Sequence, residues 1–202
     1  MGTFEIVRQF DETLFFLINS IPHPQILDQV FLFFSFYPLI IWMVVGLVLT
    51  VVEERRDKFF IIRLVLALLL SGTVASGIIK PIIKRPRPDI TFGEKVVLVE
   101  EKPAAIPANN DFAFPSGHAA VAFAGAYVVT REETAGFGKK LSRKKKRLIK
   151  LLLLSFAFMT AFSRIYLGKH FPLDVVFGGL LGWFMGFAAW KMVDFVWPRK
   201  VF

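Results

Sequence analysis

The stretch Ser163-Arg164-Ile165-Tyr166-Leu167-Gly168-Lys169-His170-Phe171-Pro172-Leu173-Asp174 separates two apolar segments, which cover about residues 148–162 and 172–197. Pro172 suits the first position of a helix, where the amide hydrogen that proline lacks would have no partner. A membrane helix needs about 20 largely apolar residues, and the two segments approach or exceed that length. A polar turn between two such segments indicates a membrane-embedded helical hairpin.

The composition of the 202-residue chain agrees with a membrane protein. Hydrophobic residues make up 55% of the chain and 24 residues are Phe, which is too apolar for an ordinary soluble domain. The length predicts a single domain over 1–202. Basic loops that face anionic headgroups explain the net charge of +9, so no nucleic-acid partner is expected. The chain has no Cys, which excludes disulfides, thiolate catalysis and cysteine metal sites.

The predicted fold is all-α, an integral membrane bundle of about five transmembrane helices with an amphipathic surface helix before it. Arg63 lies one turn into the second span, from where it can snorkel to the interface. The surface helix is predicted over 1–27, because apolar residues recur there at helical spacing. The bundle then covers 28–202, with functional loops at 80–118 and 163–174. The five spans are expected at about 29–52, 59–80, 116–129, 148–162 and 172–197, and the repeating apolar residues are Phe10, Leu14, Phe15, Ile18 and Ile21.

The loop between the third and fourth predicted spans contains the densest run of basic residues. Positive residues concentrate in cytoplasmic loops, which places this loop and the C-terminus in the cytoplasm. Counting spans from there brings the polar segments 80–88, 115–118 and 163–174 together on the extracytoplasmic face. Anionic lipid headgroups are the expected partner of the basic loop. Its basic residues are Lys139, Lys140, Arg143, Lys144, Lys145, Lys146 and Arg147.

The first of these polar segments, Lys80-Pro81-Ile82-Ile83-Lys84-Arg85-Pro86-Arg87-Pro88, is rich in cations. Phosphoryl transfer requires cations around the phosphate oxygens, an in-line nucleophile and an acid for the leaving oxygen. Lys80, Arg87 and Arg164 are the candidate phosphate-binding cations, since arginine in particular binds phosphate in a bidentate manner. A cation at a membrane boundary is also a common interface anchor, and Lys84 and Arg85 are assigned to that role.

The second segment, Pro115-Ser116-Gly117-His118, opens an apolar stretch. Ser116 is a natural N-cap, and the amide groups of Gly117 and His118 would point outward at the helix start and form an anion site. Gly117 also permits close approach of the backbone. An ordinary helix cap with an interfacial histidine is the alternative.

The third segment contains His170, with Asp174 in the first turn of the helix that follows. A carboxylate on one ring nitrogen fixes the tautomer and leaves the other nitrogen free to attack. Asp174 could instead serve only as a partner of the helix dipole. A metal site built from His118, His170 and Asp174 is disfavoured, because the surrounding cations would repel a divalent ion.

Together, Lys80-x6-Arg87-Pro88, Pro115-Ser116-Gly117-His118 and Ser163-Arg164-x5-His170-x3-Asp174 resemble the three-part signature of the type 2 phosphatidic acid phosphatase superfamily. This family of membrane lipid phosphatases shares its site with vanadium haloperoxidases. Every signature position between Lys80 and Asp174 is intact. The resemblance implies an all-helical bundle in a bacterial or archaeal plasma membrane, and hydrolysis of a lipid phosphate by water without a metal or other cofactor.

The resemblance also implies a role for each matched residue. His170 would be the nucleophile that forms a phosphohistidine, Asp174 would orient it, and His118 would protonate the leaving lipid oxygen. Water would then release inorganic phosphate. The phosphate would be bound by Lys80, Arg87, Arg164, Ser116 and the Gly117 amide, with Ser163 either beside them or only positioning Arg164.

Several functional alternatives are compatible with these residues. The candidate substrates are undecaprenyl diphosphate, phosphatidic acid, phosphatidylglycerophosphate and the 1-phosphate of lipid A. A lipid phosphotransferase and a non-catalytic lipid-phosphate binding or transport protein are the competing functions. Apolar and polar residues alternate over part of segment 91–102, which suggests a small hairpin. This segment is either a substrate-selecting lid or an inert loop. We expect the N-terminal region to lack the first span of six-span members, which should leave the chemistry unaffected and could alter substrate entry.

Overall fold

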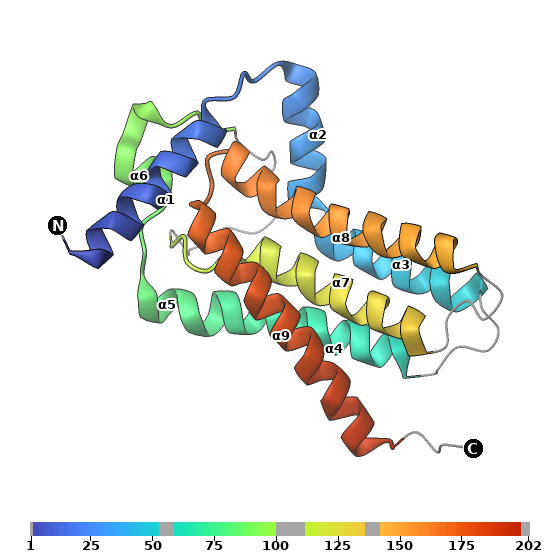
Figure 1. Ribbon diagram of the computed structural model, residues 1–202. Helices are drawn as coiled ribbons and strands as arrows, with labels where there is room; N and C mark the ends of the chain where they lie inside the picture. Colours follow the sequence, from blue (N-terminus) through green and yellow to red (C-terminus); the bar gives the residue numbers. More distant parts are fainter. Residues whose placement is uncertain (1, 53–58, 100–111, 136–141, 199–202) are drawn as a thin grey trace.

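The computed structural model describes residues 2–52, 59–99, 112–135 and 142–198. These residues form a helical bundle, and their only strand-like pairing is an isolated bridge between Pro86 and Phe112. Figure 1 shows the long helices side by side, with α1 crossing one end of the bundle. The helices are α1 (Thr3–Asn19), α2 (Gln25–Phe36), α3 (Pro38–Val52), α4 (Phe60–Gly72), α5 (Lys80–Ile83), α6 (Pro88–Phe92), α7 (Gly117–Ala135), α8 (Arg143–Tyr166) and α9 (Pro172–Val196).

α4 and α5 belong to one continuous helix, because a π-helical stretch over Thr73–Ile79 joins them. The helix ends where Lys84 adopts a left-handed conformation with φ of 52°, which is a common way for a helix to end. Lys80 therefore lies in the last turn, directly after the π-helical stretch. Such stretches often occur at functional sites.

Three helices among the described residues are long and apolar enough to cross a membrane: Phe60–Ile83, Arg147–Tyr166 and Pro172–Val196. The pair Gln25–Phe36 and Pro38–Thr50 makes a fourth candidate if this bent unit, with 66° between its halves, is one span. Pro38 accounts for the bend, because proline lacks the amide hydrogen that would continue the helix. The protein is thus an all-helical membrane protein with three to four candidate spans, fewer than the predicted number of about five.

The predicted span at 116–129 corresponds to α7, which lies in the centre of the bundle and packs against α3, α4, α8 and α9 (Figure 1). A helix whose faces all contact other helices needs small side chains more than large apolar ones. Its length and modest apolarity therefore do not reveal that α7 lies in the interior of the bundle. The fully buried alanines of α7 are Ala119, Ala120, Ala122, Ala124 and Ala126.

α9 approaches α7 closely at glycines spaced four residues apart. A Cβ atom on Gly178 would lie 2.4 Å from the carbonyl oxygen of Ser116, and one on Gly182 would lie 2.0 Å from that of Ala120. Small residues of this kind allow membrane helices to bring their backbones together. Since Ser116 immediately precedes α7, this contact also sets the distance between the starts of α7 and α9.

The predicted surface helix is present as α1. Asp11, Phe15 and Asn19, which are one turn apart, are buried against the bundle. Phe10, predicted to share the apolar face with Phe15, is instead exposed. The outer side of α1 is rich in exposed apolar residues, namely Phe4, Ile6, Val7, Phe10 and Leu17.

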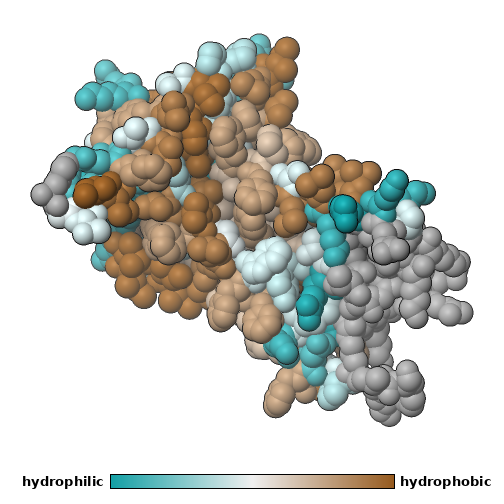
Figure 2. Space-filling view, viewed as in Figure 1, coloured by the Kyte–Doolittle hydropathy of each residue, from teal (hydrophilic) through white to brown (hydrophobic). Residues whose placement is uncertain are grey.

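The surface of the bundle is apolar between its ends. Figure 2 shows hydrophobic residues over the middle of one face and hydrophilic residues gathered toward both ends. The helices expose large apolar side chains along their length, including Leu151 and Leu152 of α8 and Leu180 and Phe184 of α9. Contiguous exposed apolar surface of this kind is characteristic of contact with lipid.

Candidate active site

The three polar segments meet at the end of the bundle that α1 crosses (Figure 1). His170 lies within reach of the charges of Lys80, Arg87 and Arg164, which all act on its imidazole ring. Asp174 is 3.8 Å from the same ring. The predicted convergence of residues 80–88, 115–118 and 163–174 is therefore present in the structure.

Backbone hydrogen bonds join segment 80–88 to the residues just before 115–118, and segment 115–118 to segment 163–174. The Ala113 amide donates to the Arg85 carbonyl oxygen at 2.7 Å, beside the Pro86–Phe112 bridge. The Ser116 amide donates to the Asp174 carbonyl oxygen at 2.8 Å. These two bonds fix the relative positions of the segments that carry the cations and histidines of the site.

The turn between α8 and α9 positions His170. Gly168 has φ of 76°, a left-handed conformation that glycine adopts without steric cost and that commonly ends a helix. The amides of Lys169 and His170 then both donate to the carbonyl oxygen of Arg164, at 3.0 and 3.1 Å. A Cβ atom on Gly168 would lie 2.6 Å from the Val97 carbonyl oxygen, so the turn also needs a glycine for space.

His170 and Asp174 are both buried. The Nδ1 atom of His170 is 3.8 Å from Oδ2 of Asp174, which is too long for a hydrogen bond, and Nδ1 has no hydrogen-bond partner among the described residues. Catalytic contacts of this kind are often long without substrate and tighten when it binds. Nδ1 is thus the ring nitrogen that faces the Asp174 carboxylate.

The surroundings of His170 favour its neutral form. Burial lowers the pKa of His170 well below its usual value, and the charges of Arg164, Lys80 and Arg87 lower it further, against a smaller opposing effect of a hydrogen bond with the Ala113 backbone. A histidine must be unprotonated to act as a nucleophile. Burial and the three cations, which also suit an anionic group, therefore both favour the neutral imidazole.

The predicted phosphate-binding cations differ in their exposure. Lys80 and Arg164 are buried, at 6% and 3% exposed, whereas Arg87 is partly exposed. Nη1 of Arg164 donates a short hydrogen bond to Oγ of Ser35, a fully buried residue of α2. Three cations around a neutral imidazole create a positive site that is suited to an anionic group.

The predicted anion-site residues Ser116, Gly117 and His118 lie at the start of α7. Ser116 is buried, and its Oγ accepts a long hydrogen bond of 3.5 Å from the Ala119 amide. Gly117 begins the helix, and its space is limited, since a Cβ atom there would lie 3.0 Å from Oγ of Ser76. His118 is partly exposed beside it.

Ser163 is the predicted phosphate-binding residue that is turned away. It is buried, and its hydroxyl group donates to the Thr160 carbonyl oxygen of the same helix at 2.7 Å. This arrangement favours the alternative in which Ser163 only positions its neighbour Arg164.

Arg85 was assigned by its sequence context to anchoring at the membrane interface, and this assignment is wrong. Nη1 of Arg85 donates to Oδ1 of Asp174 at 2.8 Å, and Nη2 donates to Oδ2 of Asp11 at 2.6 Å. The left-handed residue Lys84 reverses the chain after α5, which directs Arg85 back toward α9. Its position one residue before Pro86 in a basic segment was the only signal in the sequence.

The N-terminal helix α1 contacts the site, a contribution that no sequence motif indicated. Asp11 accepts hydrogen bonds from Arg85 and, through Oδ1, from the Leu173 amide at 2.8 Å. Asn19 donates to the carbonyl oxygens of Val97 and Tyr166 at 2.8 and 2.9 Å. α1 is therefore hydrogen-bonded to the loop after α6 and to both helices that flank His170.

The predicted hairpin is absent from the described part of segment 91–102. Residues 91–99 contain the end of α6, a single helical turn over Gly93–Lys95 and then an irregular stretch. The Val97 amide donates to Oδ1 of Asn19 at 2.9 Å and the Val99 amide to the Leu167 carbonyl oxygen at 3.3 Å. These bonds to α1 and α8 satisfy the groups that a hairpin would pair. Residues 100–102 lie outside the described residues.

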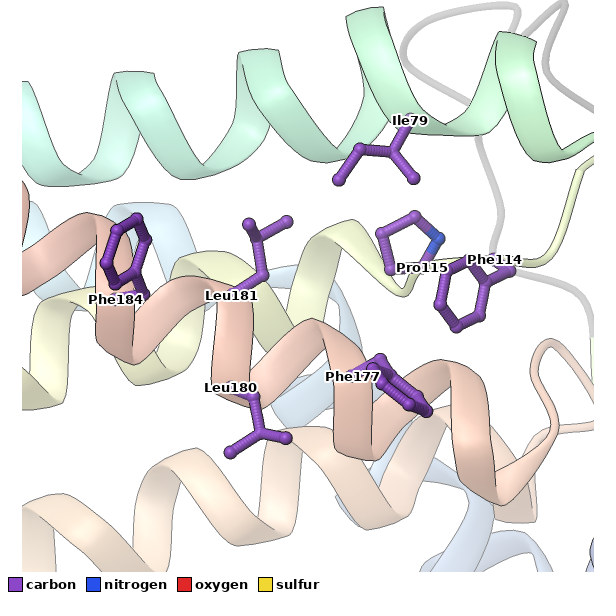
Figure 3. A pocket seen from close by; sticks show the side chains of 7 residues that line it. All are labelled: Ile79, Phe114, Pro115, Phe177, Leu180, Leu181 and Phe184. Carbon is purple, nitrogen blue, oxygen red and sulfur yellow. The ribbon is translucent and has the colours of Figure 1, made fainter.

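An apolar cavity of about 360 Å³ adjoins the polar site. Figure 3 shows its side chains, which come from the end of the Phe60–Ile83 helix, the segment before α7 and one face of α9. Two lining residues are direct sequence neighbours of phosphate-binding candidates, because Ile79 precedes Lys80 and Pro115 precedes Ser116. The cavity therefore lies next to these candidates. The lining residues are Ile79, Phe114, Pro115, Phe177, Leu180, Leu181 and Phe184. Within the described ranges, no group of three or more His, Asp or Glu residues is arranged to hold a metal ion.

A membrane bundle that buries a histidine and an aspartate among cations is suited to binding an anionic group such as phosphate. Residues 60–198 match the PAP2 superfamily, and the chain belongs to this superfamily. The resemblance predicted from the three motifs is thereby confirmed. The relatives that match are named as phosphatases, which agrees with membership in a family of membrane hydrolases.

Two relatives illustrate the range of this similarity. An undecaprenyl-diphosphatase of Sulfolobus acidocaldarius is 30% identical over 185 residues, which cover 89% of this chain and 77% of that protein. A lipid A 4'-phosphatase of Bacteroides thetaiotaomicron is 25% identical over 134 residues, or 65% of this chain. The match spans about half of that relative, at 51% of its length.

Two solved structures share the fold. The crystal structure of LpxE from Aquifex aeolicus superposes with a TM-score of 0.65 at 32% identity, covering 89% of this chain and 93% of that one. A PAP2 type phosphatidylglycerolphosphate phosphatase from Bacillus subtilis superposes with a TM-score of 0.72, covering 96% of this chain and 89% of that one. At 24% identity, the second likeness concerns the fold alone.

Proposed function

We propose that the protein is a lipid phosphate or diphosphate phosphatase that works through a phosphohistidine on His170. The observation that carries this proposal is the burial of His170 beside Asp174, within reach of the charges of Lys80, Arg87 and Arg164. Such a site binds an anionic phosphate and keeps a nucleophilic imidazole neutral. The names of the relatives, an undecaprenyl-diphosphatase and a lipid A 4'-phosphatase, agree with a lipid substrate.

In the first chemical step, Nε2 of His170 attacks the phosphorus atom and the bond from phosphorus to the lipid oxygen breaks. His118 gives its proton to that oxygen, so the lipid leaves as an alcohol or as a lipid monophosphate. Lys80, Arg87 and Arg164 bind the equatorial oxygens, together with Ser116 and the Gly117 amide. Asp174 stabilises the positive charge that develops on the imidazole ring.

In the second step, a water molecule attacks the phosphohistidine. His118, now neutral, takes a proton from the water while the bond between phosphorus and Nε2 breaks. Inorganic phosphate leaves, and both histidines return to their initial protonation states. Neither step uses a metal ion or other cofactor.

The apolar cavity supports a lipid as the substrate. A phosphate held near Lys80 and Ser116 places the adjoining lipid chain along Ile79, Pro115 and the exposed apolar face of α9. This arrangement accommodates undecaprenyl diphosphate, phosphatidic acid, phosphatidylglycerophosphate and the 1-phosphate of lipid A alike, because all four combine an anionic head with apolar chains.

We further propose that α7 crosses the membrane inside the bundle and that the site faces the extracytoplasmic side. Lys144, Lys145 and Arg147, in the first turns of α8, are exposed at the opposite end of that helix from Arg164. Basic residues favour the cytoplasmic side and contact with anionic headgroups. α1 would then lie at the outer surface with its exposed apolar residues in the membrane interface.

The test is release of inorganic phosphate from a panel of these lipids by purified protein in the presence of a chelator. We expect activity in the wild type and its loss in the His170→Ala variant, which should still insert and fold. Full activity of that variant, or an absolute requirement for a divalent metal, would contradict the mechanism. A phosphorylated acceptor in place of free phosphate would identify a phosphotransferase, and binding without turnover would identify a transport or binding protein.

A further inference from the structure

We infer that Arg85 and Asp11 are positioning residues for the reaction: Asp11 in α1 holds Arg85, and Arg85 holds the carboxylate of Asp174 against His170. The inference rests on the proposed function, because it assigns α1 a part in the same chemistry. It differs from the three motifs in that neither Asp11 nor Arg85 belongs to them.

The orientation of Asp174 depends on a separate bond to each of its carboxylate oxygens. Oδ1 accepts from Nη1 of Arg85 at 2.8 Å, and Oδ2 accepts from the Phe171 amide at 2.8 Å. Two bonds to different oxygens fix the plane of the group. The fixed oxygen Oδ2 is the one that faces Nδ1 of His170 at 3.8 Å. Without Arg85, only the amide bond would remain to orient this carboxylate among the described contacts.

Arg85 is itself held from several directions. The second terminal nitrogen, Nη2, donates to the Asp11 carboxylate, and the Arg85 carbonyl oxygen accepts from the Ala113 amide. The guanidinium carbon lies 4.2 Å from the centre of the Phe171 ring. A planar guanidinium group can address two carboxylates at once, whereas a lysine ammonium group acts as a point charge. The geometry therefore calls for arginine at this position.

Asp11 shows that α1 is joined to the site by more than apolar contact. It is 1% exposed, and its two oxygens accept from Arg85 and from the Leu173 amide in the first turn of α9. That amide is one of the groups that a helix leaves without an internal partner. Burial raises the pKa of Asp11, while the bonds from Arg85 and Leu173 oppose the rise. A buried carboxylate is costly to keep ionised and is retained only with such partners.

The charges of the three groups explain why both residues matter. Two carboxylates and one guanidinium group carry a net charge of −1, which leaves one negative charge to stabilise the developing imidazolium of His170. Loss of Asp11 would let Arg85 neutralise Asp174 completely. Loss of Arg85 would leave two carboxylates without the cation between them.

The experiment measures kcat and KM for phosphate release in the wild type and in the variants Asp11→Asn, Arg85→Lys and Arg85→Ala. We expect a fall in kcat of roughly tenfold for Asp11→Asn and roughly a hundredfold for Arg85→Ala, with KM changed little. Arg85→Lys should recover part of the loss. Glu12→Gln, which removes a neighbouring charge on α1, and Lys84→Ala, which removes the adjacent cation, are the matched controls and should keep the wild-type kcat.

Two further measurements separate positioning from folding. The double variant Asp11→Asn/Arg85→Ala should be no slower than Arg85→Ala alone, because Asp11 acts through Arg85. Guanidinium ions at low concentration should restore part of the kcat of Arg85→Ala, since Arg85 is 23% exposed, but should leave Lys84→Ala unchanged. A purely structural loss would lower the melting temperature and would not respond to guanidinium.

The outcome also distinguishes this inference from the proposed function. The nitrogen-15 resonances of the His170 side chain should shift in Asp11→Asn and remain in place in Glu12→Gln, whatever lipid is hydrolysed. If the wild type released no phosphate from any lipid, the proposed function would fail and these resonances would decide the positioning alone. Wild-type kcat together with unshifted His170 resonances in Asp11→Asn would overturn the inference.

Discussion

Two arginines pair with aspartates on α9, at opposite ends of that helix. Arg85 contacts Asp174 in the first turn of α9, and Arg63 of α4 donates to Asp194 near its end at 2.5 Å. Arg63 is fully buried and lies 4.6 Å from the centre of the Trp190 ring. It does not snorkel to the interface as its position one turn into a span suggests. The same pair of residue types thus occurs once at the reaction site and once away from it.

The difference between the two pairs lies in what else the aspartate contacts. Asp174 is fully buried and faces His170, whereas the side chain of Asp194 is 33% exposed. Arg85 bridges carboxylates of α1 and α9, whereas the bond from Arg63 to Asp194 joins α4 to α9. We therefore expect the Arg85 pair to control rate and the Arg63 pair to control stability.

The largest expected effect concerns the two aspartates. Asp174→Asn should lower kcat by roughly 10³- to 10⁴-fold. A neutral amide does not stabilise the imidazolium by charge, and it has one oxygen instead of two to accept hydrogen bonds. Asp194→Asn should leave kcat within about twofold, since it lies outside the site. Rates of phosphate release from one lipid, measured for both variants at equal folded concentration, test this contrast. Equal losses in the two variants would remove the distinction between the ends of α9.

A second expected effect concerns stability. Arg63→Ala should destabilise the protein by roughly 2 kcal/mol, less than the loss on breaking a fully buried pair, because Asp194 can turn toward solvent. Thermal unfolding in detergent measures the change as a lower melting temperature. Arg85→Lys serves as the comparison, with near-normal melting and a reduced rate. A normal melting temperature for Arg63→Ala would show that its pair with Asp194 contributes little.

A third prediction concerns the protonation of His170, which burial and then the cations of the site disfavour. Its lowered pKa means that the neutral form persists as the pH falls below about 6.5, where an ordinary histidine is half protonated. The chain has three histidines, so nitrogen-15 spectra recorded between pH 5 and 8, with His170→Gln for assignment, can follow each one. Protonation of His170 at or above its ordinary pKa would contradict the electrostatic account of the site.

The smallest expected effect concerns the cavity beside the site. Leu180→Trp should fill part of it and raise KM for long-chain lipid phosphates by several-fold, while leaving a short-chain water-soluble substrate unaffected. Leu152→Trp is the matched control, because Leu152 is a similarly exposed leucine on α8 that does not line the cavity. Equal KM changes with long and short chains would indicate that the lipid chain lies elsewhere.

The residues whose position in the fold follows from the sequence are those with a local signal. Lys80, His118 and His170 each lie at the end of an apolar segment, and the alternation of segments and turns brings such ends together. The turn at Gly168 and the helix start at Pro172 likewise follow from local chemistry. The convergence of the motifs could therefore be predicted without the structure.

The contacts that the sequence did not reveal join residues far apart in the chain. Arg85 is 74 residues from Asp11 and 89 from Asp174. No spacing rule links them, and Arg85 stands in a segment where several cations are equivalent by composition. The role of Asp11 could not be predicted for a different reason. An amphipathic helix is recognised by apolar residues on its inner side, and a polar residue there contradicts that pattern. α7 does not meet the apolarity criterion for a span because Arg131, Glu132 and Glu133 lie in its last turns, although its alanines are buried in the bundle.

The close glycine contact between α7 and α9 limits the routes by which a lipid substrate can enter and the products can leave. With Gly182 against the Ala120 carbonyl oxygen, no lipid chain fits between these two helices. A substrate that diffuses sideways in the bilayer must then arrive on the other side of α9, past Leu180 and Ile79, where the cavity lies. Under the proposed function the two products part by solubility: the dephosphorylated lipid returns to the bilayer by the same lateral route, and the phosphate ion leaves toward water.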